Sequence, residues 1–463
     1  MKHFIQKIIF VVSIISNQLV NAQSSTVPQF TLDQVVINDI GAPWGMAFIS
    51  ADEVLFTEKA GKLRKYNIST KTNNEISGLP AITQNGQGGL LDVALHPNFS
   101  TNGFVYLTYA VASGNGQTTA IGRGKLVANK LENFAELFRA LPVVNSGNHF
   151  GSRIAFDKDN FLYFSVGDRG TQDNAQNINN HAGKVMRLKD DGGVPADNPL
   201  VGKANARPEI FSWGHRNVQG MAMNPSNGLM YTHEHGPRGG DEVNVLKKGA
   251  NYGWPTITFG LNYNGTIVSE DTAREGLEQP ITYWVPSIAP CGLTFIKSAT
   301  QSDEAEVLIG ALAGTHVHWL KLKNNKVVRS AKNLQDYARF RDVEQAPDGK
   351  LYALTETPNR FIRLKSSAIT STDIVSSSNA LLDLQIFPNP SEANSTLQLT
   401  SKTRENVTIK ILGMDGSASK WTQDQMLNAG INQIELPSSF PKGAYLVEVS
   451  QGNARKYVKW IKM

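Results

Sequence analysis

The sequence predicts an all-β protein, a six-bladed β-propeller followed by a small C-terminal β-sandwich. Three observations support this fold class. The 463-residue chain contains 40 Gly and 20 Pro, which favours many turns over long helices. One hairpin-like unit recurs six times along the chain. A Ser/Thr-rich stretch then separates these units from a last segment of short strand-like runs.

The first 22 residues predict a secretory signal peptide. Lys2 and Lys7 precede an apolar stretch at 8–15, and small residues at 20–22 provide a cleavage site. The apolar run is shorter than the ~20 residues that a membrane-spanning helix needs, and no later stretch reaches that length. We therefore expect an exported protein without a transmembrane segment.

The repeated unit consists of an apolar stretch, a turn with Asp, Asn or Gly, and a second strand rich in Leu, Val and Tyr. This pattern predicts a β-hairpin. Its copies occupy 45–61, 90–110, 152–170, 220–236, 292–314 and 341–360. Hairpins also recur by chance in β proteins, but these copies share their register. Further strand-like runs such as KLRKYNI and HVHWLKL follow several copies, so the units predict a six-bladed propeller over 23–365.

A second domain is expected after the linker-like stretch at 366–378. Residues 379–463 contain the strand-like runs NSTLQLTS, NVTIKILG, AYLVEVSQG and KYVKWIKM, which predict a β-sandwich. The LQIFPNP motif, Gly413, the turn at 442–445 and the terminal run from Lys456 resemble the C-terminal sorting domain of type IX secretion cargo. This resemblance implies export by the type IX machinery, to the cell surface or beyond. The alternative is a carbohydrate-binding or adhesive sandwich.

Charge and cysteine content narrow the function classes. Basic and acidic residues nearly balance over the predicted propeller, which gives no electrostatic footprint for nucleic acid or an anionic membrane. Cys291 is the only cysteine, so no internal disulfide can form, and we expect a packed residue rather than a nucleophile. The pairs His233/His235 and His316/His318 could each present two imidazoles to a metal, but no third ligand is evident.

Polar residues gather at the strand ends on one face of the predicted propeller. Innermost strands start at this face and second strands return to it, so the flanking residues converge there. They are Trp44, Gln87, His149, the run 216–219, Cys291, Arg339 and Arg341, with Glu58, Asp168 and the runs 234–242 and 355–359. A histidine, carboxylates and arginines at one mouth indicate a binding site.

Residue chemistry suggests roles at this mouth. His149 is the candidate general base, because imidazole titrates near neutral pH, and Asp168 could orient its ring. The arginines suit a planar ligand that carries carboxylates, because a guanidinium binds a carboxylate bidentately.

Eight motifs at and around the mouth carry a family resemblance. They are QGGLLDVALHP (87–97), NHFGSR (148–153), VGDRG (166–170), RLKDDGGVPADNP (187–199), GHRNVQG (214–220), EHGPRGGDEVN (234–244), NYGWP (251–255) and RFRDV (339–343). In this order they resemble the soluble quinoprotein sugar dehydrogenases of the glucose/sorbosone type, closest to the aldose sugar dehydrogenase branch. The resemblance implies that the C1 hydroxyl of an aldose is oxidised to the lactone. The cofactors would be pyrroloquinoline quinone (PQQ) and Ca²⁺, with an external electron acceptor.

The resemblance also implies residue roles. His149 would remove the proton from the C1 hydroxyl, Asp168 would hold the imidazole, and Arg216 would stabilise charge on the quinone oxygen. Further cofactor contacts would come from Gln87, Asn217, Gln219, Arg339 and Arg341, besides Arg216.

Metal ligands are implied in the same way. The carbonyls of Gly236 and Pro237 would bind one Ca²⁺, and Glu242 with the Tyr252 carbonyl a second. Ala313 departs from the family pattern, because it stands where relatives tend to carry a lysine and so removes one expected cofactor contact.

Two other function classes compete with this interpretation. A non-catalytic propeller that binds a glycan or a partner protein has no chemical need to keep His149, Asp168 and Arg216 together. A metal-dependent lactonase-like hydrolase would need several acidic or amide ligands along the axis, for which Asp168 and Glu242 are thin support.

Overall fold

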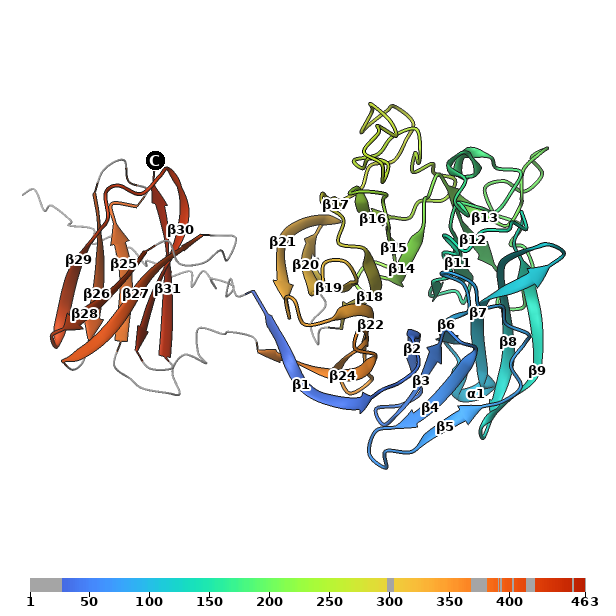
Figure 1. Ribbon diagram of the computed structural model, residues 1–463, viewed down its shortest axis with the longest axis horizontal. Coiled ribbons are helices and arrows are strands. Elements are labelled where there is room, and N and C mark those ends of the chain that lie inside the picture. Colours follow the sequence, from blue (N-terminus) through green and yellow to red (C-terminus); the bar gives the residue numbers. More distant parts are fainter. Residues whose placement is uncertain are drawn as a thin grey trace, which may run out of the picture. The chain divides into compact units, whose positions relative to one another are not determined.

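The computed structural model describes residues 27–297, 304–367, 381–389, 391, 394–401, 404–413, 421–451 and 454–462. It divides into two compact units, one spanning Gln29–Ser367 and the other formed by the described residues from 381 onward (Figure 1). The expected signal peptide at 1–22 lies outside the described residues. Within the described ranges, no helix is long and apolar enough to cross a membrane.

The larger unit is all-β and consists of six four-stranded antiparallel sheets. The first three contain β2 (Pro43–Phe48), β3 (Glu53–Glu58), β4 (Lys62–Asn67) and β5 (Asn73–Ile76); β6 (Leu90–Leu95), β7 (Phe104–Ser113), β8 (Gly116–Val127) and β9 (Lys130–Arg139); and β10 (Ile154–Phe156), β11 (Leu162–Val166), β12 (Lys184–Leu188) and β13 (Ile210–Trp213). The last three contain β14 (Val218–Met223), β15 (Met230–Glu234), β16 (Asp241–Val245) and β17 (Thr282–Trp284); β18 (Pro290–Ile296), β19 (Glu304–Ala311), β20 (Val317–Lys323) and β21 (Lys326–Asn333); and β22 (Arg339–Gln345), β23 (Leu351–Glu356), β24 (Arg360–Ser367) and β1 (Gln29–Asn38). Each repeated unit of the sequence supplies the first two strands of one sheet.

The first strands of the six sheets form a closed ring (Figure 1). Strand β2 contacts β6, and the contacts continue through β10, β14, β18 and β22 back to β2. A separate hydrophobic cluster fills the space between each pair of neighbouring sheets. Second strands such as β11 and β15 are therefore buried along their whole length. Strand β11 is correspondingly a mostly apolar run, whereas β15 also buries Thr232, His233 and Glu234.

The last sheet joins both ends of this unit. Its outer strand is β1, which pairs with β24 from Gln29↔Ser367 to Asn38↔Arg360. Ser366 and Ser367, which fall within the linker expected from the sequence, belong to β24 and pair with β1. The rest of the expected linker, from 368, lies outside the described residues.

Charged groups occupy the centre of the ring. Arg153 Nη1 lies 3.1 Å from a carboxylate oxygen of Asp92 and 3.1 Å from one of Asp342, and all three residues are buried. The starts of the inner strands line one cavity of about 280 Å³, and their other ends line a second of similar size. The first of these cavities, the mouth cavity, lies where the sequence predicts the site.

The C-terminal unit contains two antiparallel sheets. One consists of β25 (Leu381–Phe387), β26 (Ser395–Ser401) and β29 (Gly430–Leu436), and the other of β28 (Trp421–Leu427), β27 (Glu405–Gly413), β30 (Gly443–Gln451) and β31 (Ala454–Lys462). Both sheets contribute to one hydrophobic cluster, which includes Leu397, Ile409 and Trp460. Burial alternates along β26, as expected for a strand with one face against a core.

Candidate active site

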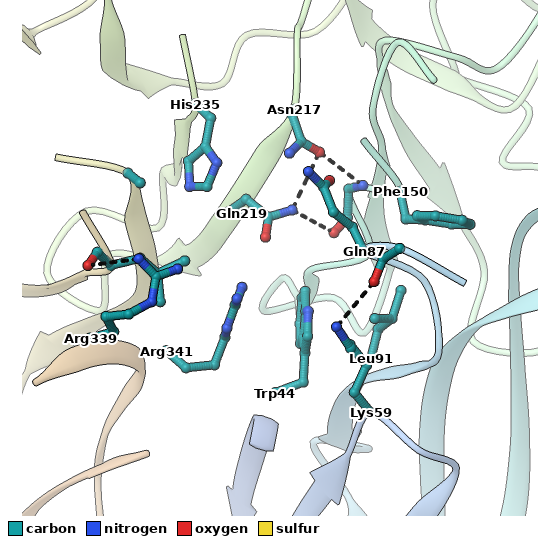
Figure 2. Close-up of a pocket in the computed structure, with 14 residues that line it drawn as sticks. Trp44, Lys59, Gln87, Leu91, Phe150, Asn217, Gln219, His235, Arg339 and Arg341 are labelled. Carbon is teal, nitrogen blue, oxygen red and sulfur yellow. Dashed lines mark hydrogen bonds between the residues drawn. The ribbon is translucent and has the colours of Figure 1, made fainter. Parts of the chain in front are cut away.

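The mouth cavity is positively charged. Lys59, Arg339 and Arg341 line it, and of the described residues that line it none is acidic. Trp44 and Phe150 add aromatic surface. Figure 2 shows Arg339 and Arg341 on one side and Lys59 on another. The residues expected to contact a cofactor and found in the lining are Gln87, Asn217, Gln219, Arg339 and Arg341. A cavity with these walls suits a flat, anionic, aromatic ligand.

The three cations differ in how firmly they are held. The Lys59 ammonium donates to the Gly86 carbonyl at 3.1 Å, and Arg339 donates to the Leu312 carbonyl at 3.3 Å. Arg341 forms a tighter pair with Glu356, with Nε 2.8 Å and Nη2 2.7 Å from Oε1. Arg339 Nε also lies 3.5 Å from Glu356 Oε2, so Glu356 pairs with both arginines, and Lys59 has the greatest freedom to meet a ligand.

Cys291 lies behind Arg341, with its sulfur 3.3 Å from Arg341 Nη1. It is fully buried, and burial raises the pKa of its thiol. The thiol therefore stays protonated at neutral pH, which fits the expected packed residue rather than a nucleophile.

His149 and Asp168 lie together beside the mouth cavity, although neither is among its lining residues. His149 Nδ1 is 2.5 Å from Asp168 Oδ1, and the His149 backbone N–H donates to Gln87 Oε1 at 2.8 Å. The second Asp168 oxygen accepts a 2.9 Å hydrogen bond from the Trp254 indole. Both rings and the carboxylate are thus fixed by contacts from three sheets or their loops.

The electrostatics of this pair favour an ionised Asp168. Burial alone would raise the pKa of Asp168, but the hydrogen bond and charge of His149, the Gly170 N–H and Arg216 together hold it below its usual value. A carboxylate accepts only, so His149 Nδ1 must donate to it. In the neutral imidazole, Nε2 then carries the lone pair, so this arrangement suits His149 as a base.

Arg216 is joined to this pair through the backbone. Its carbonyl accepts a 2.8 Å hydrogen bond from the Asp168 N–H. Its guanidinium donates to the carbonyls of Gly236 at 2.8 Å and His235 at 3.1 Å, and lies 5.5 Å from the centre of the Trp254 ring. Arg216 does not line the mouth cavity; it lines a smaller cavity next to it.

The smaller cavity, of about 10 Å³, holds the remaining metal candidates. Glu234, Gly236, Glu242 and Tyr252 line it, whereas Pro237 is buried in the adjoining turn and is not part of the lining. Burial and the neighbouring Glu234 raise the pKa of Glu242 to about 8.

Glu234 is already paired with His215 at 2.9 Å and accepts the Arg216 N–H at 2.6 Å. Glu242 has only the Asn244 amide at 3.3 Å on its carboxylate, so Glu242 beside carbonyl oxygens fits a hard cation such as Ca²⁺. No group of three or more His, Cys, Asp or Glu that could hold a metal occurs in the described part of the chain, so carbonyl oxygens would have to complete such a site.

The histidine pairs do not form chelates. His316 Nε2 and His318 Nδ1 are 3.1 Å apart and hydrogen-bonded to each other. His233 Nε2 and His235 Nε2 each lie within 2.9 Å of a different backbone carbonyl, of Gly292 and of Pro290. These hydrogen bonds use ring nitrogens that a shared metal would need. The two histidine pairs are therefore hydrogen-bonded residues of the protein interior.

Sequence reasoning missed several residues of the site. Lys59 directly follows the second strand of the first repeat, next to Glu58, and this flanking position could have identified it. Trp254 lies inside the NYGWP motif, but nothing in the spacing indicates its bond to Asp168. Ala313 follows the lining residue Leu312 and is not itself part of the lining.

Comparisons with known proteins agree with this geometry. The profile of glucose/sorbosone dehydrogenases matches residues 40–363, and that of a secretion system C-terminal sorting domain matches 385–463. An aldose sugar dehydrogenase of Escherichia coli K12 is 39% identical over 331 residues, which cover 70% of this chain and 89% of the relative. A crystal structure of a glucose dehydrogenase has a TM-score of 0.69 at 38% identity and covers 74% of this chain and 100% of its own. The PQQ-bound aldose sugar dehydrogenase of Streptomyces coelicolor has a TM-score of 0.64 at 25% identity, covering 74% and 100%. The chain therefore belongs to the glucose/sorbosone dehydrogenase family and carries a secretion system C-terminal sorting domain.

Proposed function

We propose that this chain is an exported, PQQ-dependent aldose sugar dehydrogenase that oxidises the C1 hydroxyl of its substrate to the lactone. The observation that carries the proposal is the His149–Asp168 pair beside a cation-lined cavity without acidic lining residues. The dehydrogenase relatives and the PQQ-bound neighbour support the reaction class and the cofactor. A glycan-binding propeller would not need an imidazole held by an ionised carboxylate.

The mouth cavity suits PQQ, which is a planar aromatic tricarboxylate. Lys59, Arg339 and Arg341 would bind its carboxylates, with Trp44 and Phe150 against its ring faces. The amides of Gln87, Asn217 and Gln219 would supply polar contacts. When bound, PQQ supplies a two-electron acceptor for the hydride that leaves the sugar C1.

The protein's part in the reaction is proton removal and charge stabilisation. His149 Nε2 would accept the proton of the C1 hydroxyl while the C1–H bond breaks and the C1–O bond becomes a carbonyl. Asp168 would stabilise the imidazolium that forms, and Trp254 keeps the carboxylate in place. Arg216 would stabilise the negative charge that develops on the quinone oxygen.

Calcium is the second cofactor that we propose. Glu242, Tyr252 and Gly236 all line the small cavity, so they are better supported as ligands than Pro237. The Gly236 carbonyl already accepts a hydrogen bond from Arg216, and Pro237 lies next to it. Ca²⁺ at Gly236 and Pro237 would act as a Lewis acid toward the cofactor.

The remaining proposals concern architecture and location. We infer a six-bladed propeller over 23–365, from the six sheets and their closed ring, and a β-sandwich over 379–463, from two sheets around one core. The sorting domain points to export through the type IX system, and residues 1–22 would serve as the signal peptide. The electron acceptor would then be met outside the cytoplasm.

The test is to titrate metal-stripped protein with PQQ and Ca²⁺ and to measure dye reduction with a panel of aldoses. Saturable activity that needs both additions supports the proposal. Protein that binds neither PQQ nor Ca²⁺, or that binds PQQ and oxidises no aldose, contradicts it.

A further inference from the structure

We propose that Arg169 is a positioning residue that holds the His149 backbone, an inference that rests on the proposed role of His149. Arg169 is 2% exposed. Its Nη2 donates to the Ser146 carbonyl at 2.8 Å, and its Nη1 donates to the Asn148 carbonyl. Its guanidinium also lies 3.6 Å from the centre of the Phe150 ring. The Arg169 side chain therefore contacts residues on both sides of His149, namely Ser146 and Asn148 before it and Phe150 after it.

His149 needs such support because of its backbone conformation. Its φ is 50°, which lies in the left-handed region that residues other than glycine rarely adopt. Residues in this region persist only when their surroundings fix them, and they cluster at active sites. The Gln87 side chain holds the His149 N–H. The Asn148 carbonyl is part of the peptide bond that leads into His149, and it is held by Arg169.

Asp168 and Arg169 are consecutive residues that hold different parts of His149. Asp168 contacts the imidazole at Nδ1, and Arg169 contacts the main chain that carries the imidazole. Arg169 and Gly170 have φ values of 61° and 81°, so the chain turns sharply after β11. This turn lets two consecutive side chains reach the same segment, residues 146–150.

The contacts of Arg169 argue against a purely space-filling role. Burial lowers the pKa of Arg169 to about 10, and Asp168 only partly offsets this effect. Its Nε has no hydrogen-bond partner among the described residues. An apolar side chain would fill the same space without burying a charge, but it could not donate to the carbonyls of Ser146 and Asn148, which the guanidinium fork reaches together.

The test compares Arg169→Met and Arg169→Lys with a matched control, Arg187→Met. Arg187 is also buried and stacked on an aromatic ring, 3.9 Å from the centre of Phe161. Its guanidinium is bound to Asp197 at 2.9 Å, away from the mouth cavity. Both Met variants lose a buried guanidinium, but only one loses the clamp on His149.

We expect Arg169→Met to lower kcat by about 10- to 100-fold, because a base displaced by about 1 Å costs that much in rate. PQQ affinity, measured by fluorescence titration, should stay within threefold of wild type. Arg169→Lys should recover part of kcat, since an ammonium reaches one of the carbonyls. Arg187→Met should lower the Tm and leave kcat per folded molecule unchanged.

NMR of the imidazole provides a readout that does not depend on activity. In cofactor-free protein, the His149 Nδ1–H resonance should shift or broaden in Arg169→Met and stay unchanged in Arg187→Met. Wild-type kcat in folded Arg169→Met, or an unchanged His149 resonance, would overturn the inference. Failure of the proposed function would instead show as wild-type protein that neither binds PQQ nor oxidises aldoses, while the His149 resonance still responds to Arg169.

Discussion

Replacing His149 by Ala tests the central residue of the proposed reaction. The substitution removes the only base within hydrogen-bond distance of Asp168 among the described side chains. General-base catalysis contributes about 10²- to 10⁴-fold to a rate. At about 1.36 kcal/mol per factor of ten, the barrier should rise by about 3 to 5 kcal/mol. The lost 2.5 Å bond to an ionised carboxylate should also cost about 1.5–3 kcal/mol of folding stability.

The assay is dye reduction under saturating PQQ, Ca²⁺ and aldose, with PQQ binding measured separately. Binding should persist, because Lys59, Arg339 and Arg341 line the cavity and His149 does not. His149→Gln serves as the control, since its amide can bond a sugar hydroxyl but cannot take up a proton. If His149→Ala keeps more than about a tenth of wild-type turnover, well outside the range for a lost base, His149 is not the base.

Four further outcomes are expected. Protein truncated after Ser367 should keep full dye reduction, because all candidate site residues precede that point; inactive but folded protein would contradict the two-domain interpretation. Glu242→Gln should remove the part of the Ca²⁺-induced rise in Tm that its own site contributes, which for one site corresponds to about 2.7 kcal/mol at a hundredfold excess over Kd; an undiminished rise would remove Glu242 from the site. In PQQ titrations, Lys59→Gln should weaken and Ala313→Lys strengthen binding about fivefold, the effect of one partly screened ion pair of ~1 kcal/mol; unchanged affinities would exclude both positions. The folded-state pKa of Asp168 lies below its usual value, so its stabilising contribution is complete above about pH 4 and is lost as the pH falls through the folded pKa; Asp168→Asn should flatten the loss of unfolding free energy with acid in denaturant titrations, and parallel slopes would refute this.

Much of the larger unit follows from local patterns. Alternation and turn chemistry identify the first two strands of every sheet, because a hairpin is encoded within about twenty residues. The positions flanking those strands identify Gln87, Asn217 and Gln219 as lining residues, because topology alone brings strand ends to one mouth.

Contacts that depend on side-chain direction or distant pairing could not be predicted. Trp254 reaches Asp168 across 86 residues of sequence, and no spacing rule connects them. Ser366 and Ser367 have linker composition, yet pairing with β1 draws them into β24, because backbone hydrogen bonds outweigh the weak intrinsic preferences of serine. Arg216 was expected at the mouth cavity but lines the smaller one, because its guanidinium turns toward the carbonyls of His235 and Gly236.

The closure of the ring by β1 has a consequence for the order of folding. Asp33 in β1 pairs with Arg363 in β24, 330 residues later, so the last sheet cannot form until nearly the whole unit has been synthesised. Until then β1 remains an unpaired edge strand, which is prone to wrong pairing. The ring of sheets therefore cannot close during most of the synthesis of the chain. It closes only after β24, which precedes the sorting domain in the sequence, has been synthesised and pairs with β1.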